Sequence, residues 1–173
     1  AKPYVLAVSS PSAHKNFARM VAAFLSLEGF DDVELHIVGD SHSVFSGSTS
    51  SVDGDPRVRA LGRLNDDQLV REYQGATAFV FPSLYEGFGI PLLEAMACGC
   101  PVVASRIPST VEVAGECPIY FDPLRKDGLI AALAAAIAEG RDSARTAAGI
   151  EWVRRYSWDK TAKQTLKVYQ SLI

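Results

Sequence analysis

The chain has 173 residues, of which 48% are hydrophobic and 21% charged, and its formal net charge at pH 7 is −3. This length and apolar content suit one globular domain with a buried core and exclude a disordered tail. The balance of 17 basic and 20 acidic residues argues against a nucleic-acid binder, which needs a basic surplus or a basic stripe.

The apolar residues form no run that could span a membrane. The longest weakly polar run, Leu129–Ala138, is alanine-rich and far shorter than the ~20 residues that a bilayer requires. The first residues, Ala1–Tyr4, show no signal-peptide pattern. Cys98, Cys100 and Cys117 are an odd number of cysteines, which suits reduced thiols better than a disulfide framework. We therefore expect a cytoplasmic protein without a transmembrane segment.

Short apolar runs alternate with helical spacing in the first part of the chain. Tyr4–Val8 is typical of a buried strand, and Asn16 is expected to cap a helix that Gly29 ends. The apolar positions of that helix are Phe17, Met20, Val21, Phe24 and Leu25. Val33–Val38 predicts a second strand, and Arg57–Leu61, with its alternating charges, predicts an edge strand.

The same alternation continues to the end of the chain. Asn65 is expected to cap a helix that runs through Tyr73, with acidic residues at its positive end. The other expected strands are Ala78–Phe81, Pro101–Ala104 and Ile119–Phe121. The other expected helices are Pro91–Cys98, Asp127–Glu139, Ser143–Arg155 and a last helix capped by Ser157.

Strands that alternate with helices imply right-handed crossovers and a parallel sheet covered on both faces. We therefore expect an α/β domain over residues 1–173, with a Rossmann-like, doubly wound parallel sheet of about six strands. Ligands of such sheets bind beyond the carboxyl ends of the strands. The candidate loops follow Val8, Val38, Leu61, Phe81 and Ala104.

One segment, Gly39–Pro56, is long and rich in serine and glycine, which predicts a mobile excursion. Its Asp53-Gly54-Asp55 superficially resembles the Asp-x-Asp metal motif of one class of sugar transferases. A solvated turn made by aspartate and glycine is the better interpretation, and we expect no metal site.

The most informative stretch is Phe81–Ala104. After a strand, Gly87 and Gly89 allow the backbone to approach a ligand closely, and the following helix N-terminus suits a phosphate. Glu86 and Glu94 flank this position, and two carboxylates suit hydrogen bonds to the vicinal hydroxyls of a ribose or a hexose. A polyol joined to a phosphate indicates a nucleotide sugar.

The segment Glu86-Gly-Phe-Gly-Ile-Pro-Leu-Leu-Glu94 resembles the paired-glutamate motif of a known family. That family is the glycosyltransferases of the GT-B fold, specifically the C-terminal, donor-binding domain of the large retaining family four (glycosyl transferases group 1). The resemblance covers nearly the whole chain in the right order. Further matches are Lys15-Asn16, Val38-Gly39, Leu61-Gly62, Phe81-Pro82-Ser83, Phe121-Asp122-Pro123 and Ser157-Trp158.

The resemblance implies roles for three charged residues. Glu94 matches the glutamate that binds the ribose hydroxyls of the donor, although it could also neutralise its own helix N-terminus. Glu86 matches the glutamate that contacts hydroxyls of the transferred sugar. Lys15 matches the lysine that contacts the diphosphate and stabilises the leaving group. Lys15 and Glu86 are therefore the expected catalytic residues.

The resemblance also implies donor contacts through the backbone. Phe88, Gly89 and Ile90 match the loop that holds the sugar and the β-phosphate, and the Phe88 side chain is expected to pack in the core. The turn at Leu64 matches the segment that contacts the base, mostly through main chain. Many relatives carry Gly-Arg where this chain has Ser9-Ser10, so His14 is either a replacement phosphate contact or a loop filler.

Together these matches imply the donor-binding half of a retaining hexosyltransferase, such as a mannosyl- or glucosyltransferase of polysaccharide or glycolipid synthesis. Its substrate would be a nucleoside-diphosphate sugar, with no metal and no cofactor. The N-terminal acceptor domain, which would bind a sugar or lipid-linked acceptor and could contact the inner membrane face, is expected to be missing, leaving this domain inactive alone. The alternative is a non-catalytic nucleotide-sugar-sensing module. A dinucleotide-dependent oxidoreductase is excluded, because no Gly-x-Gly-x-x-Gly follows the first strand.

Overall fold

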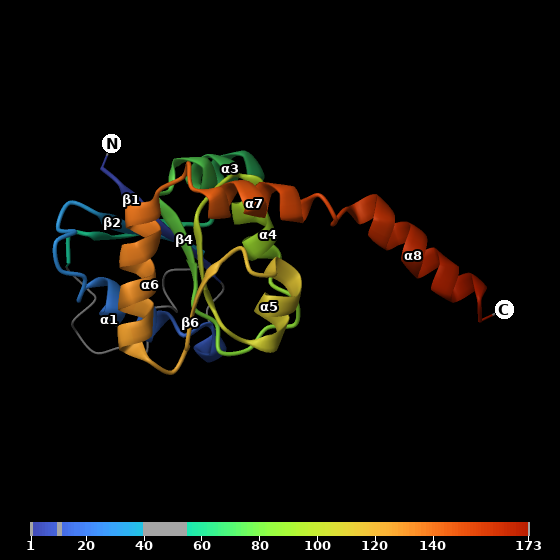
Figure 1. The fold of residues 1–173 in the computed structure, drawn as a ribbon, viewed down its shortest axis with the longest axis horizontal. Coiled ribbons are helices and arrows are strands. Elements are labelled where there is room, and N and C mark those ends of the chain that lie inside the picture. Colours follow the sequence, from blue (N-terminus) through green and yellow to red (C-terminus); the bar gives the residue numbers. More distant parts are fainter. Residues whose placement is uncertain (1, 10–11, 40–54, 173) are drawn as a thin grey trace.

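The computed structural model describes residues 2–9, 12–39 and 55–172, which form a six-stranded parallel sheet with helices on both faces (Figure 1). The strand order is β3-β2-β1-β4-β5-β6, so the predicted doubly wound, Rossmann-like fold is confirmed and β3 lies at an edge. The strands are β1 (Tyr4–Ser9), β2 (Glu34–Gly39), β3 (Val58–Gly62), β4 (Ala78–Phe81), β5 (Val102–Ser105) and β6 (Ile119–Phe121).

The central strands are buried on both faces because their alternate residues enter two separate cores. In β1, Val5 and Ala7 belong to one core and Leu6 belongs to the other. In β4, Val80 joins the first core, whereas Phe79 joins the second. The continuous apolar runs in the sequence therefore follow from a sheet that is covered on both sides.

The helices divide between these two faces. On one face lie α1 (Phe17–Phe24) and α6 (Lys126–Glu139). The other face is covered by α3 (Asp66–Gly75), α4 (Ile90–Ala97), α5 (Pro108–Ala114) and α7 (Ala144–Val153). The last helix, α8 (Trp158–Gln170), projects away from the body and is exposed along its whole length (Figure 1). No helix in the described ranges is long and apolar enough to cross a membrane.

Two helix caps predicted from the sequence, Asn65 and Ser157, are confirmed, and Ser143 caps a third helix. The Asn65 side chain accepts a hydrogen bond from the backbone N–H of Gln68 at 2.9 Å, and the Gln68 side chain accepts one from the N–H of Asn65 at 3.0 Å. Ser143 and Ser157 cap α7 and α8 in the same way, through their hydroxyl oxygens. Only the bonds of Asn65 and Gln68 are reciprocal, but all three caps satisfy donors that a helix N-terminus otherwise leaves unpaired.

Two expectations about helices were wrong, and one helix was not predicted. α1 ends at Phe24 rather than near Gly29, because tighter turns follow and the Ser26 hydroxyl donates to the Ala22 carbonyl at 2.8 Å. Asn16 precedes α1 but its side chain does not cap it: its φ of 58° is left-handed, and its Nδ2 donates to a carbonyl outside the helix. α5 was not predicted, since its seven residues are too few for a helical pattern to stand out.

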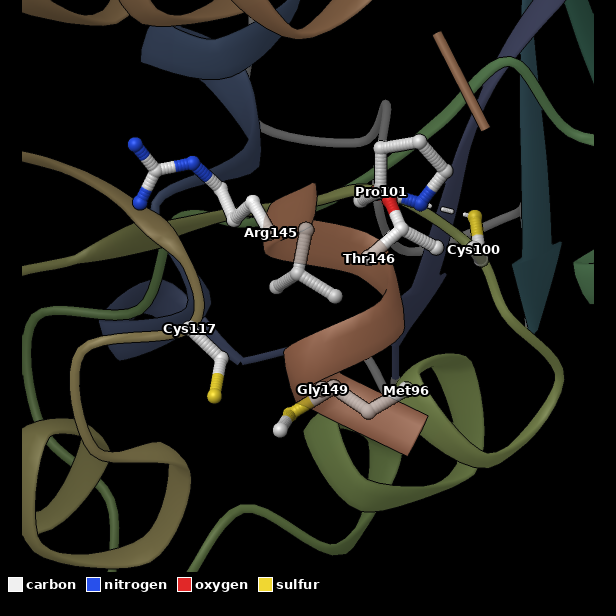
Figure 2. A pocket seen from close by; sticks show the side chains of 8 residues that line it. Met96, Cys100, Pro101, Cys117, Arg145, Thr146 and Gly149 are labelled. Atoms are coloured by element: carbon white, nitrogen blue, oxygen red, sulfur yellow. Dashed lines mark hydrogen bonds between the residues drawn. The ribbon is translucent and has the colours of Figure 1, made fainter. Parts of the chain in front are cut away.

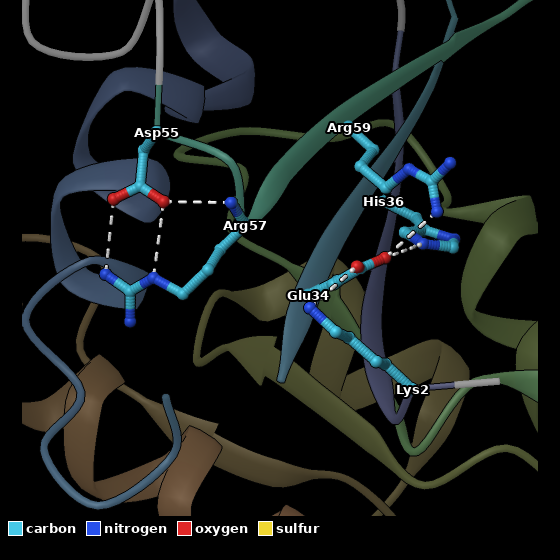
Figure 3. Close-up of polar contacts among 6 residues, drawn as sticks. All are labelled: Lys2, Glu34, His36, Asp55, Arg57 and Arg59. Atoms are coloured by element: carbon cyan, nitrogen blue, oxygen red, sulfur yellow. Dashed lines mark hydrogen bonds and ion pairs between the residues drawn. The ribbon is translucent and has the colours of Figure 1, made fainter. Parts of the chain in front are cut away.

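A polar cluster stabilises the amino ends of β2 and β3 (Figure 3). Glu34 accepts a hydrogen bond from Arg59 Nη1 at 3.1 Å, and His36 Nε2 lies 3.3 Å from the same carboxylate oxygen. These two contacts hold the pKa of Glu34 below its usual range. Nearby, Asp55 accepts hydrogen bonds from the guanidinium and backbone of Arg57. The cluster lies at the opposite end of the strands from the loops that carry the candidate site residues, so we assign it a structural role.

The three cysteines are free, as expected from their odd number. Burial raises the pKa of the Cys100 thiol to about 12, so this thiol stays protonated and unreactive at neutral pH. Cys100 and Cys117 border a cavity of about 10 Å³ between α4 and α7 (Figure 2). That volume holds at most one water molecule, so the cavity is not a ligand site.

The serine-rich excursion lies largely outside the described residues, because the structure describes nothing between Gly39 and Asp55. The Asp53-Gly54 part of the aspartate motif falls in this gap. Within the described ranges, no group of three histidine, cysteine, aspartate or glutamate side chains could hold a metal ion.

Arg141, between α6 and α7, joins the C-terminal ends of α3 and α4. Its guanidinium donates to the carbonyls of Tyr73 at 3.1 Å, Ala76 at 2.7 Å and Cys98 at 2.8 Å. The last carbonyls of a helix have no partner inside the helix, and they carry its negative end. A cation that satisfies three of them therefore fixes how the two helices sit against each other.

Replacing Arg141 by alanine should lower the free energy of unfolding by about 2–4 kcal/mol, because three carbonyls lose a charged donor. Urea unfolding measures the change. Arg154 forms an exposed ion pair with Glu151 at 2.6 Å, and Arg154→Ala should change stability by less than about 1 kcal/mol. Equal effects of the two substitutions would contradict this role for Arg141.

Candidate ligand-binding site

The site lies where the strand order reverses. β1 is hydrogen-bonded to β2 on one side and to β4 on the other, although β2 and β4 are far apart in sequence. The segments that leave the carboxyl ends of β1 and β4 therefore diverge toward opposite faces of the sheet, which is the position where ligands of such folds bind. Both segments carry predicted site residues: Lys15 follows β1, and Glu86 follows β4.

These two residues form an ion pair. Lys15 Nζ lies 2.5 Å from Glu86 Oε1, and the side chains are only 19% and 12% exposed. The ammonium also lies 5.7 Å from the centroid of the Phe81 ring, at the end of β4. The structure thus brings together a partly buried cation and a carboxylate that are 71 residues apart in the chain.

The backbone around Lys15 is fixed from two sides. Lys15 ends the 3-10 turn η1 (Ala13–Lys15), and the left-handed conformation of Asn16 redirects the chain into α1. The backbone N–H of Leu84, in the loop after β4, donates to the His14 carbonyl at 2.7 Å. The two loops that carry Lys15 and Glu86 are therefore tied to each other directly.

The His14 side chain is exposed, and its Nδ1 lies 2.6 Å from the Ser12 hydroxyl oxygen. This local contact does not decide between the two roles predicted for His14, a contact to phosphate or a structural residue of the loop.

The backbone turns sharply into α4 at Gly89. This residue is the N-cap, with a left-handed φ of 98°, and no side chain caps the helix. The conformation favours glycine, and a Cβ atom there would also lie close to the Leu92 side chain, 3.1 Å from its Cδ1. Pro91 occupies the first turn, where its missing N–H costs nothing. The N-cap glycine therefore has no side chain that could accept a hydrogen bond from the N–H groups of the first turn.

Glu94 lies on α4 and accepts a hydrogen bond from the Tyr73 hydroxyl, with 3.0 Å between the phenol oxygen and Oε2. Tyr73 comes from the adjacent helix α3 and is 1% exposed. The sequence pattern predicts Tyr73 only as the end of a helix. A tyrosine on the buried face of a helix needs a hydrogen-bond partner for its hydroxyl. A polar neighbour of Tyr73 could therefore have been predicted from the sequence.

The predicted core position of the Phe88 side chain was wrong. Phe88 is 44% exposed, and its ring meets that of Tyr156 edge to face, with 5.9 Å between the centroids. Phe88, Ile90 and Glu94 line one side of an open groove of about 690 Å³, whose other side comes from the end of α7 and the start of α8, including Trp158. The short α4 has only one buried face, so its outer residues form this groove.

Leu64, in the turn after β3, is partly buried against the core that contains Tyr73 and Leu92. Its side chain therefore supports the turn from inside. The expected base contact through the main chain of this turn stays a prediction.

The fold and this site define a doubly wound α/β domain with a partly buried ion pair at its switch point. Residues 1–149 match the family described as glycosyl transferases group 1. The chain belongs to this family, which the resemblance in the paired-glutamate motif predicted.

Several relatives support this assignment. Over 118 residues the chain is 40% identical to an O-antigen chain mannosyltransferase B of Escherichia coli, a match that covers 66% of this chain and 30% of the relative. It is 36% identical to a phosphatidyl-myo-inositol mannosyltransferase of Mycobacterium leprae, over 84% of this chain and 40% of the relative. The structure is similar to sucrose-phosphate synthase from Thermosynechococcus elongatus, with a TM-score of 0.81 and 26% identity, covering 99% of this chain and 45% of that chain. The chain thus spans less than half the length of these relatives.

Two glycines of the loop provide a matched test of the backbone geometry. Gly89→Ala should lower the free energy of unfolding by about 1–2 kcal/mol, because alanine disfavours the left-handed conformation. Gly87 is exposed, and an added Cβ there would meet nothing within 4 Å. Gly87→Ala should therefore stay within about 0.5 kcal/mol of the wild type in urea unfolding. A neutral Gly89→Ala variant would contradict the preference for glycine at the start of α4.

Proposed function

We propose that this chain is the donor-binding domain of a retaining family-four glycosyltransferase of the GT-B fold, and that it binds a nucleoside-diphosphate sugar. The observation that carries the proposal is the Lys15–Glu86 pair at the switch point of the sheet, where Glu86 belongs to the loop that leads into the uncapped N-terminus of α4. A cation and helix N–H groups suit a diphosphate, and a carboxylate suits the hydroxyls of a sugar.

Lys15 is the diphosphate contact in this proposal. An ammonium has three donors, so a diphosphate oxygen can bind Lys15 alongside or in place of the Glu86 carboxylate. Low exposure strengthens this contact, because water screens a partly buried charge less than an exposed one. Lys15 would thereby stabilise the negative charge that builds up on the departing diphosphate.

Glu86 would orient the transferred sugar, and the backbone N–H groups at Phe88, Gly89 and Ile90 would hold its β-phosphate. Glu94 would accept hydrogen bonds from the ribose hydroxyls. A carboxylate accepts several hydrogen bonds, so it can bind two vicinal hydroxyls at once. His14 is a second candidate phosphate contact, and the turn at Leu64 is the candidate base contact.

The proposed reaction requires no metal ion, no cofactor and no general base on this domain. The bond between the anomeric carbon and the diphosphate oxygen breaks, and the acceptor hydroxyl oxygen forms a bond to the same face of that carbon. The hydroxyl proton passes to the departing diphosphate. The protein contributes position and electrostatic stabilisation of the leaving group.

The acceptor side of the reaction would belong to a second domain. The chain spans 30–45% of the length of the relatives named above, which supports an N-terminal acceptor domain elsewhere in the whole protein. Two relatives are mannosyltransferases named for an O-antigen chain and for phosphatidyl-myo-inositol, which supports mannose as the hexose and a sugar or lipid-linked acceptor. We propose a cytoplasmic location, supported by three free cysteines, with any contact to the inner membrane face made by the acceptor domain.

The test is a thermal-shift panel of GDP, UDP, ADP and their mannose and glucose conjugates. The cognate diphosphate should stabilise the chain by about 2.7 kcal/mol at 100 times its Kd. Lys15→Ala should raise that Kd about 10- to 100-fold by calorimetry, because a charged hydrogen-bond donor is lost. Lys163→Ala, on the exposed helix α8, is the control and should bind like the wild type.

The outcomes separate the parts of the proposal. If none of these ligands shifts the melting temperature of the wild type, the donor-binding function is wrong. If the wild type binds and Lys15→Ala has the same Kd, Lys15 is not in the site. A whole protein that binds the donor but transfers no sugar to any acceptor would favour the alternative, a nucleotide-sugar-sensing module.

A further inference from the structure

The hydrogen bond between Tyr73 and Glu94 connects the donor site to a helix that carries none of the predicted donor-binding side chains. The phenol oxygen lies 3.0 Å from Glu94 Oε2. Glu94 is partly exposed at the edge of the groove, whereas Tyr73 is fully buried in the second core. A buried group of fixed position thus contacts a group that can reach a ligand.

We propose that Tyr73 is a positioning residue that holds the Glu94 carboxylate in the orientation that receives the ribose hydroxyls of the donor. This inference rests on the proposed function, because it concerns the same site. It adds a residue that touches no ligand and acts only through Glu94.

An ionised carboxylate only accepts hydrogen bonds, and its two oxygens can be used separately. Tyr73 binds Oε2, which leaves Oε1 to accept from a ligand hydroxyl. A glutamate side chain otherwise moves among many rotamers, and fixing it on ligand binding costs entropy. Tyr73 removes part of that cost in advance, since it fixes the side chain in the empty protein.

Tyr73 is itself fixed by ring packing, by burial and by a hydrogen bond to its backbone. Its ring packs edge to face against Phe79 of β4, with 5.4 Å between the centroids. Its backbone carbonyl accepts from Arg141 Nη1 at 3.1 Å, and its side chain is 1% exposed. The hydroxyl therefore cannot follow a Glu94 that swings away, and the hydrogen bond forms in one geometry.

The phenol is a permanent donor. Burial, and then the neighbouring Glu94 carboxylate, raise the pKa of Tyr73 well above its usual value. Tyr73 therefore keeps its proton throughout the pH range of a binding experiment. A merely structural hydroxyl would satisfy Glu94 equally well, so the test must measure the ligand group on which Glu94 acts.

Tyr73→Phe removes one oxygen atom and keeps the buried ring. The probes are the tightest-binding ribonucleoside diphosphate among GDP, UDP and ADP and its 2′,3′-dideoxy counterpart, measured by calorimetry. The variant should bind the ribonucleotide about tenfold more weakly and the dideoxynucleotide within twofold of the wild type. Glu94→Gln should show a larger loss with the same dependence on the ribose hydroxyls.

Tyr4→Phe is the matched control. The Tyr4 hydroxyl also contacts α3, since it donates to the Glu72 carbonyl at 2.9 Å, but it does not touch Glu94. Its loss should change stability without changing the preference for a ribose over a dideoxyribose. If Tyr73→Phe and Tyr4→Phe prefer the ribonucleotide over the dideoxynucleotide by the same factor, the Tyr73 hydroxyl is only structural.

The remaining outcomes are also decisive. If the wild type and Glu94→Gln differ in the ribose preference but Tyr73→Phe matches the wild type, the inference is overturned and the proposed function stands. If Tyr73→Phe weakens both nucleotides equally, the effect is a general distortion and the inference is again overturned. If the wild type binds no nucleoside diphosphate, the proposed function fails and the inference fails with it.

Discussion

The parallel pairing of β1 with β4 is the constraint on which the rest of the structure depends. β1 also pairs with β2, so the chain must cross back over the sheet after β3 to reach the centre again. This return places the loops after β1 and β4 side by side and directs them to opposite faces. The Lys15–Glu86 contact exists only because of that adjacency, and the hydrogen bond from Leu84 to His14 fixes it.

The second core holds the other half of the site. α3 and α4 pack on the same face of the sheet, and Arg141 fastens their C-terminal ends. The same pair of helices supplies Tyr73 and Glu94, so the packing that stabilises the domain also sets the distance between these two side chains. Fold and site geometry therefore share one set of contacts, and a change at Arg141 would disturb both.

The local sequence pattern was enough to predict the strands, because buried parallel strands appear as continuous apolar runs. It also predicted most helices, because Asn65, Ser143 and Ser157 cap helices by local hydrogen bonds. At Asn16 the prediction failed because a tertiary contact overrides local preference. Asn16 favours both a cap and a left-handed turn, and its contact with the Pro123 carbonyl selects the turn. The motif identified Glu86 and Glu94, but their protein partners come from other elements and no spacing in the sequence encodes them.

Helix α8 differs from the other helices because it does not pack against the sheet. Its 13 residues are all exposed, and its apolar side chains, including Trp158 and Tyr169, pack into neither core. An isolated helix of this length is only marginally stable in water. The helix should therefore unfold locally while the rest of the domain stays folded. Its backbone amides should exchange with solvent far faster than those of the sheet. Slow exchange along α8 would then report that its apolar side chains are covered by another surface.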